Sequence, residues 1–430
     1  MRSRFSDGQR FMILCVICGV LCGLAAVGFH MAIEGVFHLL KATAQSFGDW
    51  RFYVIMGVGP VVGALVVGVI LQHFAPSAAG SGIPQTKRAY YNDFGKIGLG
   101  EGIWRFVLGT IFVGLGNALG REGPTVHMCA SIASKLGQWA FRAKSRVQAM
   151  VPVGMAAGIA AAFNAPLSAI TFVFEELLDD FSTKALGGIV VAVVISAAVA
   201  RSILGEEPVL NVHFPDDFQT HGWMLIALPM GVASAVVGHA LVRSLLWTRE
   251  RMRVSTMPIW MKATSGGFCV GVLGLSAFVI TGLLGDGSQF GVFSIGYGSL
   301  DQAFGAKLAA GSLIVLLLFK FAAVVVSYAS GGSGGLFSPT LFLGGMLGGL
   351  LGVCMVALDQ QFGFLDQHEA ADVIGACTLL GMGSMFASVV RCPFTSLLII
   401  FEMTRSYSLM LPLMVGNVIS YFMASRWQTV

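Results

Sequence analysis

The sequence predicts an all-α integral membrane protein made of two inverted structural repeats with broken, tilted helices. Three observations predict it: the composition, a series of long apolar segments, and an internal duplication. Of the 430 residues, 56% are hydrophobic and only 11% are charged, and the mean hydropathy is +0.80. An ordinary soluble domain carries roughly 25% charged residues. The missing polar surface therefore indicates that the surrounding solvent is the hydrocarbon of a bilayer.

The composition also argues against other kinds of partner. The net charge of +4 is small and scattered, and no run of Lys and Arg interleaves with aromatic residues, so no nucleic-acid partner is expected. Most of the eight cysteines lie inside apolar runs, where they are expected as small buried hydrophobes. Cys15, Cys18 and Cys22 could begin a metal site, but no second Cys/His pair stands at ligand spacing. Neither a metal, a cofactor nor a disulfide is expected.

Apolar segments long enough to span a membrane recur along the whole chain. The first follows a basic, polar N-terminus and is longer than a signal-peptide core, so it is predicted as a membrane helix that starts in the cytoplasm. All are predicted as helices, because lipid leaves the backbone of any other open structure without partners. The segments are residues 11–33, 52–74, 101–119, 185–204, 222–247, 259–284, 308–329, 336–358, 370–390 and 409–425.

Glycine and proline interrupt the apolar pattern at several places. A broken helix inside a membrane requires a cavity or a site to satisfy its backbone. The breaks are therefore the first candidates for functional positions. They lie at residues 80–84, 120–124, 164–166, 331–339 and 392–393.

The chain contains a duplication. Six residues recur in the second half, every pair 227 residues apart (Gly154 to Gly381), and the pair Pro-Thr recurs upstream at a slightly different offset. We therefore predict two repeats in one transmembrane domain, residues 1–215 and 216–430. Basic residues before the first segment and at 249–253 indicate cytoplasmic loops, and the acidic stretch 206–217 between them indicates an outer loop, which makes the repeats inverted. The recurring residues are Gly154, Met155, Ala160, Pro166, Phe174 and Glu175, matched by Gly381, Met382, Ala387, Pro393, Phe401 and Glu402.

Three of the breaks place the start of a helix at membrane depth. They read GSGIP at 80–84, GREGP at 120–124 and GGLFSP at 334–339, and in each the proline falls where the first helical turn tolerates it. The free N–H groups and the positive end of the helix dipole at such a start bind anions. Three helix starts that converge would hold a permeant anion without any full positive charge. A buried Lys or Arg pair would instead bind the anion too tightly to release it.

Ionisable residues at membrane depth cost about 2.5–3.5 kcal/mol each and so require a reason. Glu122 lies in the first turn of a broken helix, where its carboxylate would compete with the anion for the same N–H groups. Glu175 and Glu176 end one apolar run and Glu402 ends its counterpart. For each acid the alternative is a capping or interfacial carboxylate. Lys320 is expected as a snorkelling or paired structural charge.

The motifs GSGIP, GREGP and GGLFSP, with the helix that ends in FEE, resemble the CLC family of chloride channels and proton-coupled chloride transporters over nearly the whole chain. The resemblance implies a homodimer with one pore in each subunit. It implies that the Ser81 hydroxyl and the backbone N–H groups of Leu336 and Phe337 hold a central anion, with Gly80 and Gly335 in the same breaks.

The same resemblance assigns roles to two acids. Glu122 matches the external gate and proton acceptor, and Glu176 matches the acid that receives protons from the cytoplasm, which many of the family's channels lack. A proton/chloride antiporter of a bacterial inner membrane is therefore expected, with a passive glutamate-gated anion channel as the alternative. Ser81 favours chloride, since the nitrate-preferring branch has proline there.

Two features limit what the resemblance carries over. The family's pore also uses a tyrosine on a short last helix, but Tyr421 lies in the preceding apolar segment and the sequence ends at Val430, so this ligand is either absent or cut off. No cytoplasmic nucleotide-binding domain is expected after Arg426. A membrane-embedded hydrolase is the third class considered; it is disfavoured because His127 has neither a nucleophile nor a carboxylate next to it in the sequence, and His127 is expected to pack between helices.

Overall fold

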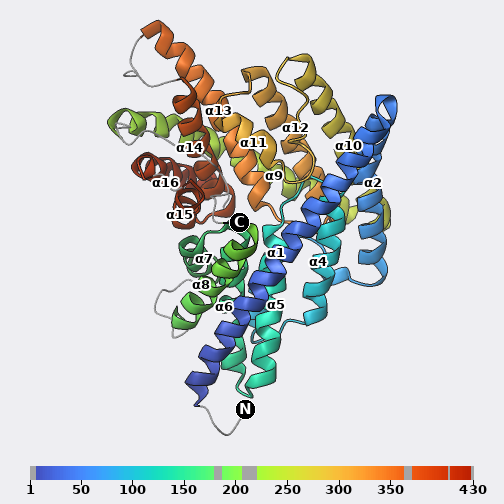
Figure 1. Ribbon diagram of the computed structural model, residues 1–430, viewed down its shortest axis with the longest axis vertical. Coiled ribbons are helices and arrows are strands. Elements are labelled where there is room, and N and C mark those ends of the chain that lie inside the picture. Colours follow the sequence, from blue (N-terminus) through green and yellow to red (C-terminus); the bar gives the residue numbers. More distant parts are fainter. Residues whose placement is uncertain (1–5, 179–185, 206–219, 363–369, 405–406, 428–430) are drawn as a thin grey trace.

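The computed structural model describes residues 6–178, 186–205, 220–362, 370–404 and 407–427, and within them the regular structure is helical (Figure 1). A short 3₁₀ turn, Pro76–Ala78, and a π-helical turn, Phe174–Leu178, accompany the α-helices. The α-helices are α1 (Asp7–Phe47), α2 (Asp49–His73), α3 (Ile83–Asn92), α4 (Leu99–Gly114), α5 (Glu122–Ala140), α6 (Lys144–Phe163), α7 (Pro166–Val173), α8 (Leu186–Leu204), α9 (Thr220–Val254), α10 (Ile259–Leu283), α11 (Tyr297–Phe304), α12 (Ala310–Ala329), α13 (Phe337–Phe362), α14 (Ala370–Val390), α15 (Pro393–Thr404) and α16 (Met410–Trp427).

Within the described residues, nine helices are long and apolar enough to cross a membrane, which confirms the predicted class. Three places differ from the predicted segments. α6 was not predicted as a membrane-length segment, because it begins with Lys144 and Arg146 and is less hydropathic than the others. The predicted segment 409–425 is helical as α16, but it is not one of these nine helices. The segment 101–119 is helical only to Gly114, since the chain then turns through Gly116 at φ 100°, a conformation that favours glycine.

α6 and α14, which contain the duplicated Gly-Met pairs, form the interior of the molecule. In the apolar 18-residue stretch of each helix, 83% of the residues are buried, against 39–56% in the other membrane-length helices. Long helices such as α1 and α2 run along the outside (Figure 1) and expose large apolar side chains, among them Leu24, Met31 and Val58. A protein in a bilayer needs interior helices that are apolar on every side and outer helices whose apolar side chains face the lipid. This structure has both.

All five predicted breaks are confirmed as places where a helix begins or ends. α3, α5, α7, α13 and α15 each start inside one of them, with a proline in the first three residues. Four of the turns contain a left-handed residue: Gly82 has φ 93°, Asn164 has φ 55°, Gly331 has φ 96° and Arg391 has φ 65°. The backbone preferences of glycine, asparagine and proline therefore account for where these helices end and begin.

The two repeats meet in a reciprocal arrangement. Gly120 and Gly335, which hold equivalent places before α5 and α13, form an antiparallel bridge with N···O distances of 2.8 and 2.7 Å. α7 packs against its counterpart α15. An antiparallel contact between equivalent residues is what inverted repeats produce. The division at residue 215 stays a prediction, because residues 206–219 lie outside the described part of the chain.

Glu175 and Glu402 show the same reciprocity. Glu175 accepts the backbone N–H groups of Phe394 (3.1 Å) and Thr395 (2.7 Å) at the start of α15. Glu402 accepts those of Leu167 (2.9 Å) and Ser168 (2.8 Å) at the start of α7. Each carboxylate caps the helix of the opposite repeat, which satisfies free N–H groups and complements the helix dipole. The capping alternative is therefore what the structure shows for both acids.

Candidate functional site

The three glycine-flanked breaks meet at one place. The Gly80 N–H donates to the Gly332 carbonyl at 3.1 Å, which joins the first break to the third, and the Gly120–Gly335 bridge joins the second to the third. Gly123 lies against both Ser81 and Gly335, so closely that a side chain there would collide with the Ser81 backbone. The predicted convergence of three helix starts is confirmed as geometry.

The start of α13 presents unpaired backbone donors at this meeting point. The first turn closes with a bond from the Thr340 N–H to the Leu336 carbonyl (3.0 Å), so the N–H groups of Leu336 and Phe337 precede any acceptor within the helix. The Phe337 ring is fixed between the rings of Phe163, Phe172 and Phe386. The structure thus places Leu336, Phe337 and Gly335 beside the Ser81 break, and their contact with an anion stays a prediction.

Glu122 lies fully buried at the same helix start. Its carboxylate accepts the Ser338 hydroxyl, and the Ser338 N–H approaches Oε2 at 3.4 Å. The Tyr297 hydroxyl lies 3.5 Å from Oε1 and 3.0 Å from the Ser338 hydroxyl. The carboxylate therefore occupies the first turn of α13, where the sequence predicts that an anion binds.

Arg105 is a site residue that the sequence analysis missed. It lies on α4 with no exposed surface, and its guanidinium donates to the carbonyls of Gly80 (2.9 Å) and Ser77 (2.9 Å). These carbonyls belong to the turn that presents Ser81. An arginine inside a predicted apolar segment was the available signal, because a buried charge requires a partner.

We expect Arg105→Met to weaken chloride binding and to lower the unfolding temperature in detergent, because two partly buried carbonyls would lose their charged donor, at about 1–3 kcal/mol each at most. Arg105→Lys, which keeps the positive charge but has a single donor nitrogen in place of the guanidinium fork, should recover part of both. Unfolding followed by tryptophan fluorescence with and without chloride measures the two effects. Chloride stabilisation equal to wild type in Arg105→Met would show that the turn holds its shape without this residue.

Tyr297 is the second residue that was missed. It begins α11 after Gly296, whose φ of 91° turns the chain into the helix. The preceding loop is held by Lys320, which is fully buried and donates to the carbonyls of Gly291 (3.0 Å) and Ser294 (2.7 Å), among others. Lys320 is thus a structural charge bound by carbonyls, and the snorkelling alternative is wrong because the ammonium never reaches the surface. No sequence signal connects Tyr297 with Glu122, because the two residues lie 175 positions apart in the chain.

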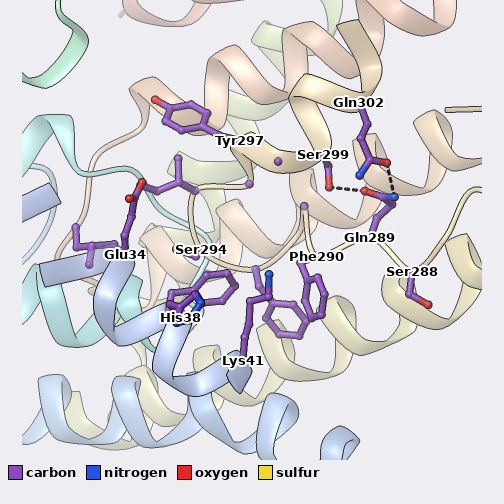
Figure 2. Close-up of a pocket in the computed structure, with 17 residues that line it drawn as sticks. Glu34, His38, Lys41, Ser288, Gln289, Phe290, Ser294, Tyr297, Ser299 and Gln302 are labelled. Atoms are coloured by element: carbon purple, nitrogen blue, oxygen red, sulfur yellow. Dashed lines mark hydrogen bonds between the residues drawn. The ribbon is translucent and has the colours of Figure 1, made fainter. Parts of the chain in front are cut away.

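A cavity of about 410 Å³ opens beside Tyr297. Figure 2 shows Glu34, His38 and Lys41 rising from α1 on one wall and Tyr297 on the other. The predicted cytoplasmic start of α1 would place its second half, and this cavity with it, on the outer side. A second cavity of about 270 Å³ also includes Glu34 and Tyr297 in its lining, so these two residues stand between the two cavities.

Glu176 lies away from Glu122, in the π-helical turn that follows α7. Its carboxylate pairs with Lys87 of α3 at 3.6 Å, and the Cys392 thiol lies 3.9 Å from Oε2. The Glu176 side chain is 25% exposed, whereas Glu175 is committed to its cap on α15. The two neighbouring acids therefore face different surroundings, as their helical spacing predicts, and the role of Glu176 in proton transfer stays a prediction.

His127 corrects one expectation. It does more than pack between helices, because Nδ1 lies 2.8 Å from the Thr86 hydroxyl and Nε2 lies 3.6 Å from the Glu101 carboxylate. A hydroxyl and a carboxylate thus flank the imidazole in space although neither is adjacent in the sequence. The Thr86 hydroxyl is fully buried and donates to the Gly82 carbonyl at 3.0 Å, so it is engaged in the Ser81 turn.

Comparison with known proteins agrees with this geometry. A family model described as voltage gated chloride channel matches residues 63–425. The chain is 30% identical over 427 residues to the H(+)/Cl(-) exchange transporter ClcA of Cronobacter sakazakii, covering 96% of this chain and 86% of the relative. It is 28% identical over 422 residues to the ClcA transporter of Salmonella paratyphi B, covering 94% and 83%.

Solved structures share the fold. A slow cyanobacterial Cl-/H+ antiporter superposes with a TM-score of 0.85 at 23% identity, covering 97% of this chain and 95% of that one. A CLC-type fluoride/proton antiporter superposes with a TM-score of 0.79 at 21% identity, covering 98% and 96%. With a family model over most of its length and a relative at 30% identity, this multi-pass membrane chain belongs to the voltage-gated chloride channel family, the CLC family.

Proposed function

We propose that the chain is a proton-coupled chloride antiporter that moves chloride across the membrane in exchange for protons. The position of the Glu122 carboxylate carries the proposal. It accepts the Ser338 N–H and hydroxyl at the start of α13, and so it occupies donors that a chloride ion would also use. The relatives named as H(+)/Cl(-) exchange transporters support the same reading.

The geometry gives a physical basis for exchange. A charged carboxylate and a chloride ion compete for the same helix start, so the two exclude each other there. Protonation neutralises the carboxylate and weakens its hold on the N–H groups, so binding of a proton favours entry of the anion. Glu122 would thus be both the external gate and the proton acceptor, while the partly exposed Glu176 would deliver protons from the cytoplasm.

The main test is transport by the purified protein in liposomes. A chloride gradient alone is expected to drive protons in the opposite direction against their own gradient, which is seen as a pH change in a weakly buffered medium. Under a pH gradient the reversal potential should depart from the chloride equilibrium potential. A reversal potential that equals the chloride value at every pH would instead establish the passive, glutamate-gated channel.

Three further statements belong to the proposal. The protein is expected as a homodimer with one pore in each subunit, surrounded by lipid of a bacterial inner membrane, and it acts as a transporter and not as an enzyme. The family and the membrane-length helices support the multi-pass placement. Light scattering in detergent measures the number of subunits, and membrane fractionation measures the location.

Ser81→Pro is expected to shift selectivity from chloride towards nitrate. The hydroxyl supplies one donor suited to a small spherical ion, and its loss favours an anion with a lower cost of dehydration. Loss of one hydrogen bond to a charged group corresponds to roughly a tenfold change in relative affinity. Competition between chloride and nitrate in a flux assay measures it, with Ser81→Ala as the control that removes the hydroxyl alone. An unchanged ratio in both variants would show that Ser81 does not bind the anion directly.

A further inference from the structure

His127 is a buried titratable residue that the proposed transport mechanism does not use. It lies on α5, the helix that begins with Glu122, and its side chain is only 1% exposed. The turn that presents Ser81 passes directly against it, since a methyl group added at Gly82 would lie 2.7 Å from the His127 Cβ. The imidazole therefore lies against the backbone that holds Ser81.

A series of polar groups leads from this turn to solvent. The Thr86 hydroxyl lies 3.0 Å from the Gly82 carbonyl and 2.8 Å from His127 Nδ1. On the other side of the ring, Nε2 lies 3.6 Å from the Glu101 carboxylate, whose side chain is 41% exposed. Nε2 itself is buried and, among the described residues, has no partner at hydrogen-bond distance. Glu101 is thus the solvent-accessible end of the series, and Gly82 is its inner end.

The number of protons in this series is limited. The Thr86 hydroxyl has one proton, and both the Gly82 carbonyl and an unprotonated Nδ1 can accept it. When the hydroxyl donates to Gly82, Nδ1 of His127 must carry a proton and donate to the hydroxyl oxygen. A neutral ring then turns an unprotonated Nε2 towards the Glu101 carboxylate, so that two acceptors face each other. This arrangement is therefore favoured only when His127 and Glu101 share a further proton.

Loss of that proton to solvent through Glu101 reverses the series. The remaining ring proton is best placed on Nε2 of His127, where it faces the carboxylate, so Nδ1 becomes an acceptor. The Thr86 hydroxyl then turns to Nδ1, and the Gly82 carbonyl keeps only the Thr86 N–H at 2.9 Å. One positive charge beside the Ser81 turn disappears in the same step. Both changes make the turn a poorer place for an anion.

The other charge near the ring does not change in this step. α5 packs against α1, α3, α4, α6 and α13. In the described part of the chain, the charged groups that act on the imidazole are Glu101 and Arg105, both of α4. The Arg105 guanidinium remains charged at all ordinary pH values. The pair of His127 and Glu101 is therefore the titratable element through which pH acts on this turn.

We propose that His127 is a positioning residue for the anion at Ser81, and that the proton it shares with Glu101 sets the affinity for chloride. With that proton in place, the Thr86 hydroxyl supports the Gly82 carbonyl and chloride binds more tightly. The inference rests on the proposed function for the identity of the ion and for Ser81 as its ligand. It adds a pH-dependent element separate from Glu122, whose carboxylate competes with the anion directly.

The first test measures chloride binding by calorimetry in the full chain carrying Glu122→Gln, so that this acid no longer titrates. Affinity should be roughly threefold to tenfold higher at about pH 5.5 than at about pH 8, the range in which histidine changes charge. In the same background, His127→Asn should still bind chloride but lose this dependence, because its amide keeps a donor near the position of Nδ1 and cannot titrate. Equal affinity at both pH values with His127 present, or a pH dependence that persists in His127→Asn, would overturn the inference.

The second test observes the ring directly and does not depend on transport. In nitrogen NMR of protein with isotopically labelled histidine, the signals absent from His127→Asn belong to His127. They should show a ring protonated on Nε2 alone at about pH 8 and on both nitrogens at about pH 5.5. A ring protonated on Nδ1 alone at the higher pH would overturn the inference. The expected titration in a protein that binds no chloride would instead overturn the proposed function and leave the proton-controlled turn standing.

Two matched substitutions separate this pair from general charge effects. In the calorimetric test, Glu101→Gln should abolish the pH dependence, because its amide donates to or accepts from Nε2 without a shared proton. Glu250→Gln neutralises another partly exposed carboxylate, one that pairs with Arg253 of α9 at 2.9 Å, and it should leave the dependence intact. Equal losses in the two variants would overturn the inference, since the effect would then come from surface charge.

Discussion

Replacement of Glu122 by glutamine or by alanine is expected to abolish proton-coupled transport while chloride flux continues. Neither side chain can carry a proton, so proton movement should fall to the level of protein-free liposomes. The alanine also vacates the start of α13, where the carboxylate accepts the Ser338 N–H and hydroxyl, so chloride binding should become stronger in that variant. Proton uptake driven by a chloride gradient measures the first effect, and chloride titration by calorimetry measures the second.

Glu402→Gln is the control for this experiment. It also neutralises a carboxylate that accepts backbone N–H groups at a helix start, but the helix is α7 and the site is remote from Glu122. It should lower thermal stability and keep proton transport coupled. Uphill proton transport that persists in either Glu122 variant would show that Glu122 is not the proton acceptor.

Glu176→Gln is expected to lose proton transport and to keep chloride transport. Glu176 is the acid at which the duplication breaks down, because the residues equivalent to Glu175 and Glu176 are Glu402 and Met403. Its side chain is partly exposed and pairs with Lys87 at 3.6 Å, so it can exchange protons with the solvent on its side of the membrane. Its loss should also remove the dependence of proton flux on internal pH.

Glu175→Gln is the matched control, because it makes the same change one residue earlier. The Glu175 carboxylate caps α15 through Phe394 and Thr395, so its neutralisation should cost roughly 1 kcal/mol of stability and leave coupling at least partly intact. Proton flux at the parent rate in Glu176→Gln would place the internal proton route elsewhere, with Glu175 as the first candidate.

The helix starts that the sequence predicted correctly share one property: their signal is local. Glycine before proline in the first helical turn marks where α3, α5 and α13 begin, because backbone conformation is decided by neighbouring residues. These helix starts then converge because equivalent segments of the two repeats contact each other, as at the bridge between Gly120 and Gly335. Packing of α7 against α15 was not predicted in detail, yet the shared acids Glu175 and Glu402 had indicated what the halves hold in common.

The sites that were missed depend on contacts between distant parts of the chain. Arg105 matters because it reaches the carbonyls of Gly80 and Ser77, and Tyr297 matters because its hydroxyl reaches Glu122. Residue type alone does not show such partners, since a buried arginine or tyrosine looks the same in the sequence whatever it contacts. His127 is the same case, as its partners Thr86 and Glu101 come from two other helices.

The sequence by itself determined the membrane class, the duplication and the positions of the helix breaks, because hydropathy and backbone preference are properties of short segments. Only the tertiary structure decided which charged residues cap a helix, which hold the turn that presents Ser81, and which are buried without a partner for every donor. Arg121 shows the difference most clearly: the sequence places it beside Glu122, but only the fold buries its guanidinium, with Nη2 donating to the Ala162 carbonyl and Nε and Nη1 left without a protein partner. Desolvation by the surrounding fold, and not residue identity, sets what a charge in this protein must bind.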